Sequence, residues 1–218
     1  MVSLPFIFSI PHATMLFRFL ALVIVVAFVG SCSSIQNITQ SLTNLKNTQF
    51  KLGAVRGFRL AGVDISRLSD PKKLSVTDGL ALTRAFAEKR FPATFTLDVE
   101  ARNPNTGQGG TRQSSVTLSK LDWRLLIDDV QTIAGDIQSP VEVPGNGQAT
   151  VIPLGVTLDL YQFFADKGMD GIVNLAMAIG GVNGSAARLK LDAMPTVSTP
   201  FGPMQYPGRI AIVDKEYR

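Results

Sequence analysis

The stretch from Phe91 to Asn105 constrains the fold of this chain more than any other. Apolar and polar residues alternate along it, with Phe95, Leu97, Val99 and Ala101 set between Thr94, Thr96, Asp98, Glu100 and Arg102. A period of two turns one set of side chains toward a core and the other toward water. The run ends at Asn103-Pro104-Asn105, where proline removes a ladder donor and asparagine can bond nearby backbone. The sequence therefore predicts a half-buried antiparallel strand that leads into a turn.

Similar alternation elsewhere predicts several more short strands. Three glycines interrupt the apolar residues of 50–65, which favours two short strands or one bent strand with a bulge. Further strands are predicted within 116–127, 133–143, 152–160, 187–191 and 210–212. Strong turn sequences lie between them, at 144–147 and 199–203. Many short strands separated by turns are typical of a mainly β chain folded as an antiparallel β-sandwich.

Particular residues refine this prediction. The phase of the alternation changes by one residue near Ser119, which indicates a β-bulge. Trp123 falls on the inward face and is predicted to anchor the core rather than to stack on a ligand. Asp128 and Asp129 are interpreted as a charged turn, because no calcium-loop pattern surrounds them. Pro153 predicts an edge strand or the beginning of a strand.

Two helices are expected in addition to the strands. The first is predicted over 75–90, because Ser75 can cap its N-terminus and Asp78 lies in its first turn. Its buried face is expected to carry Val76, Leu82 and Phe86. The second is predicted over 161–179 and is expected to break near its middle, where two glycines occur.

The composition excludes several kinds of chemistry. The chain has one cysteine, Cys32, and one histidine, His12, both near the N-terminus. A mature protein without His12 could hold neither a Ser-His-Asp nor a Cys-His site, and a zinc site is equally disfavoured. The 21 basic and 17 acidic residues are interspersed along the chain, which does not favour nucleic-acid binding. We therefore expect no catalytic residues, no metal site, no cofactor and no nucleic-acid partner.

The N-terminal segment predicts a membrane anchor. An uninterrupted apolar run over 19–29 follows Arg18, and its length suits the core of a signal peptide. Gly30 and Ser31 then precede Cys32. This arrangement resembles the lipobox of bacterial lipoproteins, in which the chain is cut before the cysteine and the cysteine is acylated. The resemblance implies a signal peptide over 1–31, cleavage between Ser31 and Cys32, lipidation of Cys32, and a polar tether over 32–48.

Three questions about this segment stay open from the sequence. The apolar run could instead remain as an uncleaved single-span anchor, or Cys32 could be an ordinary buried cysteine. Translation could begin at Met1 or at Met15. Ser33 follows the cysteine in place of aspartate, which by resemblance to enterobacterial lipoproteins favours the outer membrane over the inner membrane.

Residues 49–214 resemble the group 2 late embryogenesis abundant family, also called the water stress and hypersensitive response domain. The resemblance is carried by the strand that enters Asn103-Pro104-Asn105, by the passage from strand to helix through Asp159-Leu160-Tyr161, and by the closing 187–212 region with its Phe201-Gly202-Pro203 turn. It implies a seven-stranded sandwich of fibronectin type III or immunoglobulin-like build with a helix in one crossover. It does not imply an enzyme. The helix over 75–90 and the long broken helix depart from the compact family pattern.

Two functional hypotheses follow from the sequence. The first is a non-enzymatic domain facing the periplasm and held on the membrane through lipid on Cys32, which binds or stabilises an envelope protein or lipid; a role under desiccation rests on the resemblance alone. The second is a lipid or peptide carrier, or an assembly subunit, whose core opens between the 161–179 helix and the sheet. Four side chains suggest that cavity, namely Phe163, Phe164, Met169 and Met177.

Overall fold

The structure is a computed structural model that describes residues 47–108, 113–199, 202–214 and 217. The predicted signal peptide, Ser31, Cys32 and nearly all of the tether lie outside the described residues. Pro200 and Phe201 of the predicted closing turn lie outside them as well.

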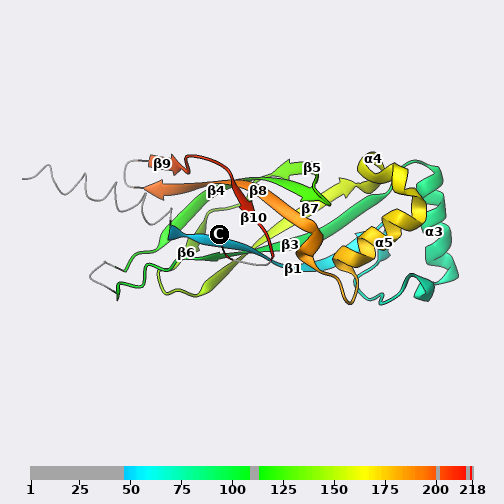
Figure 1. Cartoon of the computed structure of the whole chain (residues 1–218), viewed down its shortest axis with the longest axis horizontal. Coiled ribbons are helices and arrows are strands. Elements are labelled where there is room, and N and C mark those ends of the chain that lie inside the picture. The colour runs from blue at the N-terminus through cyan, green and yellow to red at the C-terminus, as the bar shows by residue number, and fades with distance from the viewer. Residues whose placement is uncertain (1–46, 109–112, 200–201, 215–216, 218) are drawn as a thin grey trace, which may run out of the picture. The chain divides into compact units, whose positions relative to one another are not determined.

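The first of two antiparallel sheets contains the strand on which the sequence analysis rests (Figure 1). Its members are β1 (Gln49–Leu60), β2 (Val63–Asp64), β3 (Pro92–Arg102) and β7 (Ala149–Asp159). They lie in the order β2-β1-β3-β7. The predicted half-buried strand is therefore the central β3, whose inward side chains are buried.

The second sheet is also antiparallel and contains the remaining strands. They are β4 (Val116–Ile127), β5 (Val130–Gly135), β6 (Val141–Val143), β8 (Leu189–Thr199), β9 (Gly202–Gln205) and β10 (Ile210–Ile212). The main order is β10-β8-β4-β5, while β6 pairs with β4 and β9 pairs with β8. The chain is thus mainly β, with two antiparallel sheets, as predicted.

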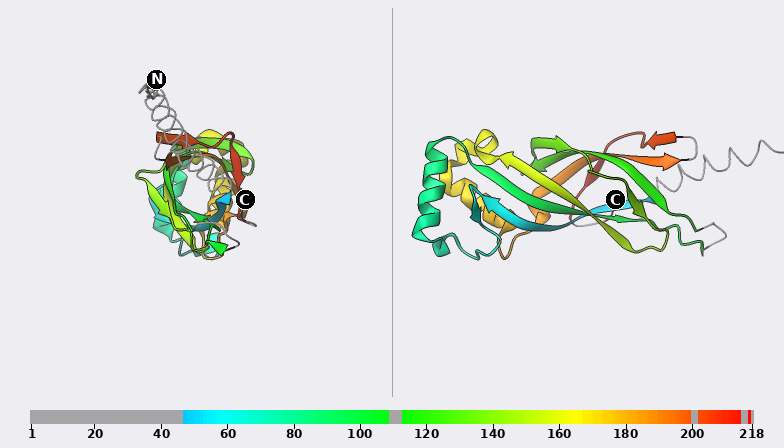
Figure 2. Two further views of the ribbon diagram at one scale, coloured as in Figure 1. Left: turned by 90° about the vertical axis from the view of Figure 1, so that its left-hand side faces the viewer. Right: turned by 180° about the vertical axis from the view of Figure 1, so that it is seen from behind.

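The helical segments gather at one end of the strands (Figures 1 and 2). They are η1 (Pro71–Lys73), α3 (Val76–Ala87), α4 (Leu160–Phe164), η3 (Ala165–Lys167), α5 (Gly168–Gly180) and η4 (Ala186–Arg188). The predicted break in the second helix is confirmed, because α4, η3 and α5 replace one continuous helix. We call this region, formed by η1, α3, α4, η3 and α5, the helical end.

Several local predictions are confirmed. The pairing of β1 with β3 shifts register twice, so β1 is one bent strand with bulges. The pairing of β4 with β8 shifts between Leu118 and Lys120, where the bulge was expected. Asp128 and Asp129 both have positive φ in the turn between β4 and β5. Trp123 is buried within the single hydrophobic core that both sheets and the helices share.

The prediction for Pro153 is also confirmed. Of the described strands, only β3 pairs with β7, and the register between them runs without interruption from Pro92 opposite Asp159 to Arg102 opposite Ala149. A proline can lie in such a ladder only where its missing N–H faces the open side. Pro153 therefore marks β7 as the edge of the first sheet.

Four predictions need correction. Val76 was expected on the buried face of its helix, but it is 83% exposed. Val76 lies six positions before the buried Leu82, which is about one and two-thirds turns, so the two side chains point to different sides. The helix also ends at Ala87 rather than Arg90, and 133–143 falls in two strands rather than one. Strand β8 begins at Leu189, because residues 186–188 form the 3-10 turn η4.

A glycine allows α5 to approach the first sheet closely. A Cβ atom at Gly180 would overlap the side chain of Phe58 on β1. Phe58 in turn stacks on Phe95 of β3, with ring centroids 4.9 Å apart. The last turn of α5 is thus packed directly against the aromatic side chains of the first sheet.

This packing predicts opposite effects for two glycine substitutions. Gly180→Ala should lower the free energy of unfolding by about 1–3 kcal/mol, because the added methyl group overfills a packed contact. Gly79→Ala in α3 should raise it by about 0.5–1 kcal/mol, because nothing lies within 4 Å of the new methyl group and alanine favours helix. Urea denaturation followed by Trp123 fluorescence would measure both. Equal effects of the two substitutions would contradict the close approach of α5.

Candidate functional site

The predicted turn motif at Asn103-Pro104-Asn105 lies directly after β3, at the end of the first sheet away from the helices (Figure 1). The other predicted site residues, Ser31 and Cys32, lie outside the described part of the chain. The geometry of the turn motif therefore decides whether it is a binding site or a structural element.

The side chain of Asn103 is fully buried and fully bonded. Its Nδ2 atom donates to the carbonyl oxygens of Ser114, at 2.9 Å, and Val143, at 3.3 Å. Its Oδ1 atom accepts from the backbone N–H of Asn105 at 3.1 Å and from the Asn105 side-chain amide at 2.7 Å. A residue with 0% exposure whose amide already has four partners offers nothing to a ligand. The motif is a structural junction.

The neighbouring turn at 144–147 packs against this junction. The N–H of Gly147 donates to the Asn103 carbonyl at 3.1 Å, and Arg102 Nε donates to the Gly147 carbonyl at 2.6 Å. A Cβ atom at Gly145 would overlap the carbonyl oxygen of Ser114. The junction thus joins the end of β3, the approach to β4 and the connection between β6 and β7.

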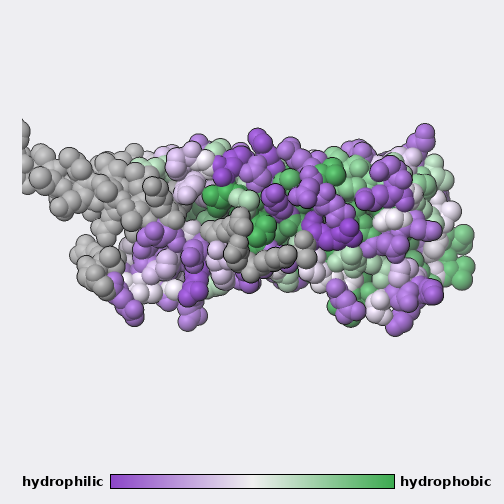
Figure 3. Space-filling model, in the orientation of Figure 1, coloured by the Kyte–Doolittle hydropathy of each residue, from purple (hydrophilic) through white to green (hydrophobic). Residues whose placement is uncertain are grey.

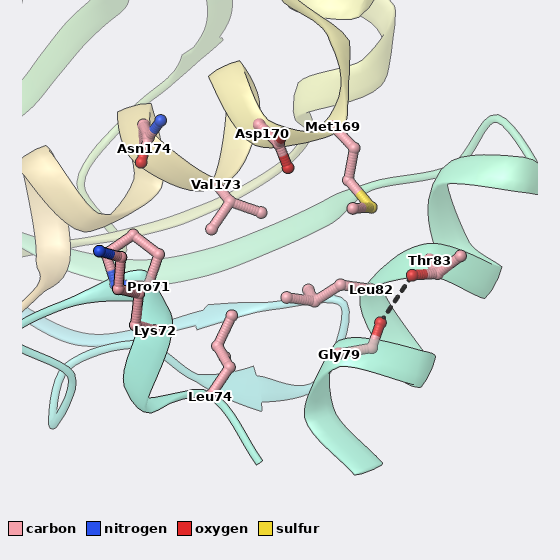
Figure 4. A pocket seen from close by; sticks show the side chains of 10 residues that line it. All are labelled: Pro71, Lys72, Leu74, Gly79, Leu82, Thr83, Met169, Asp170, Val173 and Asn174. Atoms are coloured by element: carbon pink, nitrogen blue, oxygen red, sulfur yellow. Dashed lines mark hydrogen bonds between the residues drawn. The ribbon is translucent and has the colours of Figure 1, made fainter. Parts of the chain in front are cut away.

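A pocket of about 440 Å³ lies at the helical end, between η1, α3 and α5 (Figure 4). Its volume is within the range of small-molecule sites, roughly 300–1,000 Å³. The lining residues are Pro71, Lys72, Leu74, Gly79, Leu82, Thr83, Met169, Asp170, Val173 and Asn174. Leu82 and Val173 belong to the buried core, so the inner wall is apolar.

Polar groups stand on both sides of this pocket. Lys72 comes from η1 and Thr83 from α3, whereas Asp170 and Asn174 lie one turn apart on α5. The hydroxyl of Thr83 donates to the carbonyl of Gly79, one turn earlier in α3, at 2.8 Å. An apolar interior with a few polar groups at its margin suits a ligand that has an apolar body and a polar end.

The pocket does not lie where the sequence suggested a cavity. Of the four side chains behind that suggestion, only Met169 lines the pocket. Phe164 is buried in the core, and Phe163 and Met177 pack against it. The lining residues of η1 and α3 were missed, because nothing in the sequence indicates that these two elements face α5 across a gap.

A second polar cluster surrounds Tyr217 near the C-terminus. The Tyr217 hydroxyl donates to Glu100 Oε2 at 2.6 Å, and this bond, together with partial burial, raises the pKa of Tyr217. The ring centroid lies 5.2 Å from Lys51 Nζ and 6.0 Å from the Arg102 guanidinium. Every group in the cluster is thus engaged within the chain. Sequence analysis gave no signal for it, since the four residues are far apart in the chain.

Two features are absent from the described residues. No three Asp, Glu, His or Cys side chains among them come close enough together to hold a metal ion. Across that same part of the chain, no helix has the length and apolar character needed to cross a membrane.

Comparison with known proteins gives only distant similarities. No protein-family model and no curated protein matches this sequence. The chain is similar to a crystal structure of a protein from Archaeoglobus fulgidus, with 13% identity over 58% of this chain and 82% of that chain, and a TM-score of 0.32. It is also similar to the solution structure of a candidate late embryogenesis abundant protein, with 15% identity, coverage of 91% and 88%, and a TM-score of 0.34. These similarities do not assign the chain to a family.

The buried amide yields a direct test of the junction. Asn103→Ala should lower the free energy of unfolding by about 3 kcal/mol, because it removes four hydrogen bonds of a buried amide. Asn146→Ala is the matched control, since Asn146 is exposed and, within the described part of the chain, accepts only the N–H of Gln148. That substitution should cost less than about 1 kcal/mol. Urea denaturation of both variants would decide, and similar costs would contradict a special role for Asn103.

Proposed function

We propose that this chain is a non-enzymatic domain of the bacterial cell envelope, anchored by lipid on Cys32, that binds an envelope protein or lipid. The observation that carries the proposal is the sequence of Arg18, the apolar run over 19–29, the small residues Gly30 and Ser31, and then the only cysteine of the chain. More than one acyl chain on Cys32 would hold the protein stably on a membrane. The domain then faces the periplasm, and Ser33 favours the outer membrane.

The proposed domain is a β-sandwich of fibronectin type III or immunoglobulin-like build from the group 2 late embryogenesis abundant family. The strand orders β2-β1-β3-β7 and β10-β8-β4-β5 support such a build, because the chain passes from the first sheet to the second, returns to the first for β7 and ends in the second, and the two sheets share one core. The proposal extends to protection of the envelope under water stress, which rests on the family resemblance alone.

A binding role is supported by the chemistry of the described polar groups. The buried amide of Asn103 and the cluster around Tyr217 are both bonded within the chain. The pocket at the helical end combines one lysine, one aspartate, one asparagine and a threonine hydroxyl that bonds its own helix. This set suits recognition of a ligand better than activation of a nucleophile.

Intact mass and detergent partition would test the anchor. Wild-type protein expressed in a bacterium should lack residues 1–31, carry acyl chains on Cys32 and enter the detergent phase. Cys32→Ala should abolish the added acyl mass and the cleavage together, whereas Ser33→Ala should preserve both. An unmodified Cys32 with residues 19–29 still attached would replace the lipid anchor with a single-span anchor.

A second candidate function is transport of a lipid or peptide, and the pocket between α3 and α5 favours it. The pocket brings Leu74, Leu82, Met169 and Val173 together around an interior of about 440 Å³. Methionine suits such a role, since its flexible, polarizable side chain adapts to apolar ligands of different shape.

Native mass spectrometry would test the carrier hypothesis. Wild-type protein released from detergent should carry a non-covalent mass that disappears under denaturing conditions, whereas acyl groups on Cys32 would remain. Thr83→Trp should abolish this mass, because the indole would fill the pocket from its margin. Thr77→Trp should retain it, since Thr77 is exposed on α3 and is not part of the lining. An empty wild-type pocket would eliminate this second function.

A further inference from the structure

The outer face of α3 carries apolar side chains that no described part of the chain covers. Val76 is 83% exposed and Leu80 is 66% exposed. They lie four residues apart, so their side chains stand on the same face, one turn from each other. Figure 3 shows apolar surface at the end of the domain that α3 occupies. Large apolar side chains exposed side by side in this way are typical of an interaction surface.

Exposed basic residues precede and follow α3 in the sequence. Residues 67–90 contain six basic side chains, which are Arg67, Lys72, Lys73, Arg84, Lys89 and Arg90. They contain three acidic ones, which are Asp70, Asp78 and Glu88. These acids are engaged locally, since Asp70 caps η1, Asp78 bonds the N-cap of α3, and Glu88 pairs with Arg84 at 2.9 Å. With Asp64, which pairs with Arg67 at 3.4 Å, and with Asp166, Lys167 and Asp170 of the neighbouring helices, this end has seven basic and six acidic side chains, a net charge of +1.

The orientation of α3 exposes this face as a whole. The helix lies across the end of the strands rather than along them (Figures 1 and 2). A helix that lies flat, with exposed apolar residues in its first two turns and basic residues before and after it in the sequence, suits contact with an anionic membrane surface. A protein partner of standard size would need a larger apolar centre than two side chains provide.

We propose that the outer face of α3 docks onto an anionic phospholipid surface, with Val76 and Leu80 entering the interface and the flanking lysines near the phosphates. The chain enters the domain at Gln49, at the end opposite to α3 (Figure 1). If the proposed anchor on Cys32 is correct, α3 is therefore available to a lipid surface other than the one that holds the anchor. This last step rests on the proposed function, whereas the docking itself does not.

A vesicle-capture assay would test the docking separately from the anchor. Full-length protein is reconstituted in phosphatidylcholine vesicles, and dye-labelled phosphatidylglycerol vesicles are added. Retention of the protein in the first vesicles reports the anchor, and capture of the second vesicles reports docking. We expect capture of phosphatidylglycerol vesicles, weaker capture at high salt, and little capture of labelled phosphatidylcholine vesicles.

Two loss variants and a matched control define the face. Lys73→Gln with Lys89→Gln should weaken capture roughly thirtyfold, since each surface lysine contributes about fivefold. Val76→Ser with Leu80→Ser should weaken it about tenfold by removing the inserted apolar groups. The control, Lys120→Gln with Lys190→Gln, removes two lysines of the second sheet and should capture like wild type. None of the substituted residues lines the pocket.

A gain variant keeps the test decisive if a loss variant folds poorly. Leu80→Trp should strengthen capture and shift its own emission to the blue on phosphatidylglycerol vesicles, because tryptophan favours the membrane interface. Three results would overturn the proposal: equal capture of both lipids, loss variants that capture like wild type, or a Leu80→Trp emission unchanged by anionic vesicles. Retention in the first vesicles would stay intact in each case, so a failed docking leaves the proposed anchor standing.

Discussion

The buried side-chain amide of Asn103 is the interaction on which one end of the structure depends. Its two N–H groups and its oxygen hold Asn105 and Ser114, from the two ends of the connection between β3 and β4, together with Val143 at the end of β6. A buried amide without partners would cost free energy comparable to several lost hydrogen bonds. The connection between β3 and β4 is therefore fixed relative to the end of β6, and this sets where β4 and β6 pair in the second sheet.

A single carboxylate has a comparable role where β3 begins. Asp159 Oδ1 accepts the backbone N–H of Phe91 at 2.7 Å and that of Tyr161 at 3.0 Å. The N–H of Leu160 donates to the carbonyl of Phe91 at 3.0 Å. Asp159 thus closes the ladder between β3 and β7 and caps α4 with the same atom. This explains how a strand passes into a helix without leaving buried N–H groups unpaired.

The elements that the sequence predicted well are those governed by local chemistry. Alternation defined β3, β4 and β7, a phase change located the bulge before Lys120, and glycines located the break between α4 and α5. Leu82 and Phe86 of the predicted buried face of α3 do contact the core, but Val76 was mispredicted, because a helix whose apolar residues lie on several sides has no single inward face until its neighbours are known. The pocket and the Tyr217 cluster were missed for a related reason. Both depend on residues brought together by tertiary packing.

The two ends of the domain differ in how strongly the stability of the fold constrains their residues. At the Asn103 end, the polar groups of the junction are hydrogen-bonded within the chain. A substitution there is therefore expected to lower the stability of the fold rather than to weaken binding of a partner. At the helical end, Val76 and Leu80 contribute little to the core because most of each side chain is in water. Stability therefore places little constraint on these two positions, since exposed substitutions usually change the free energy of unfolding by less than about 0.5 kcal/mol. A polar residue at either position would have satisfied the fold equally well, so the apolar character of this face requires an explanation outside the domain itself.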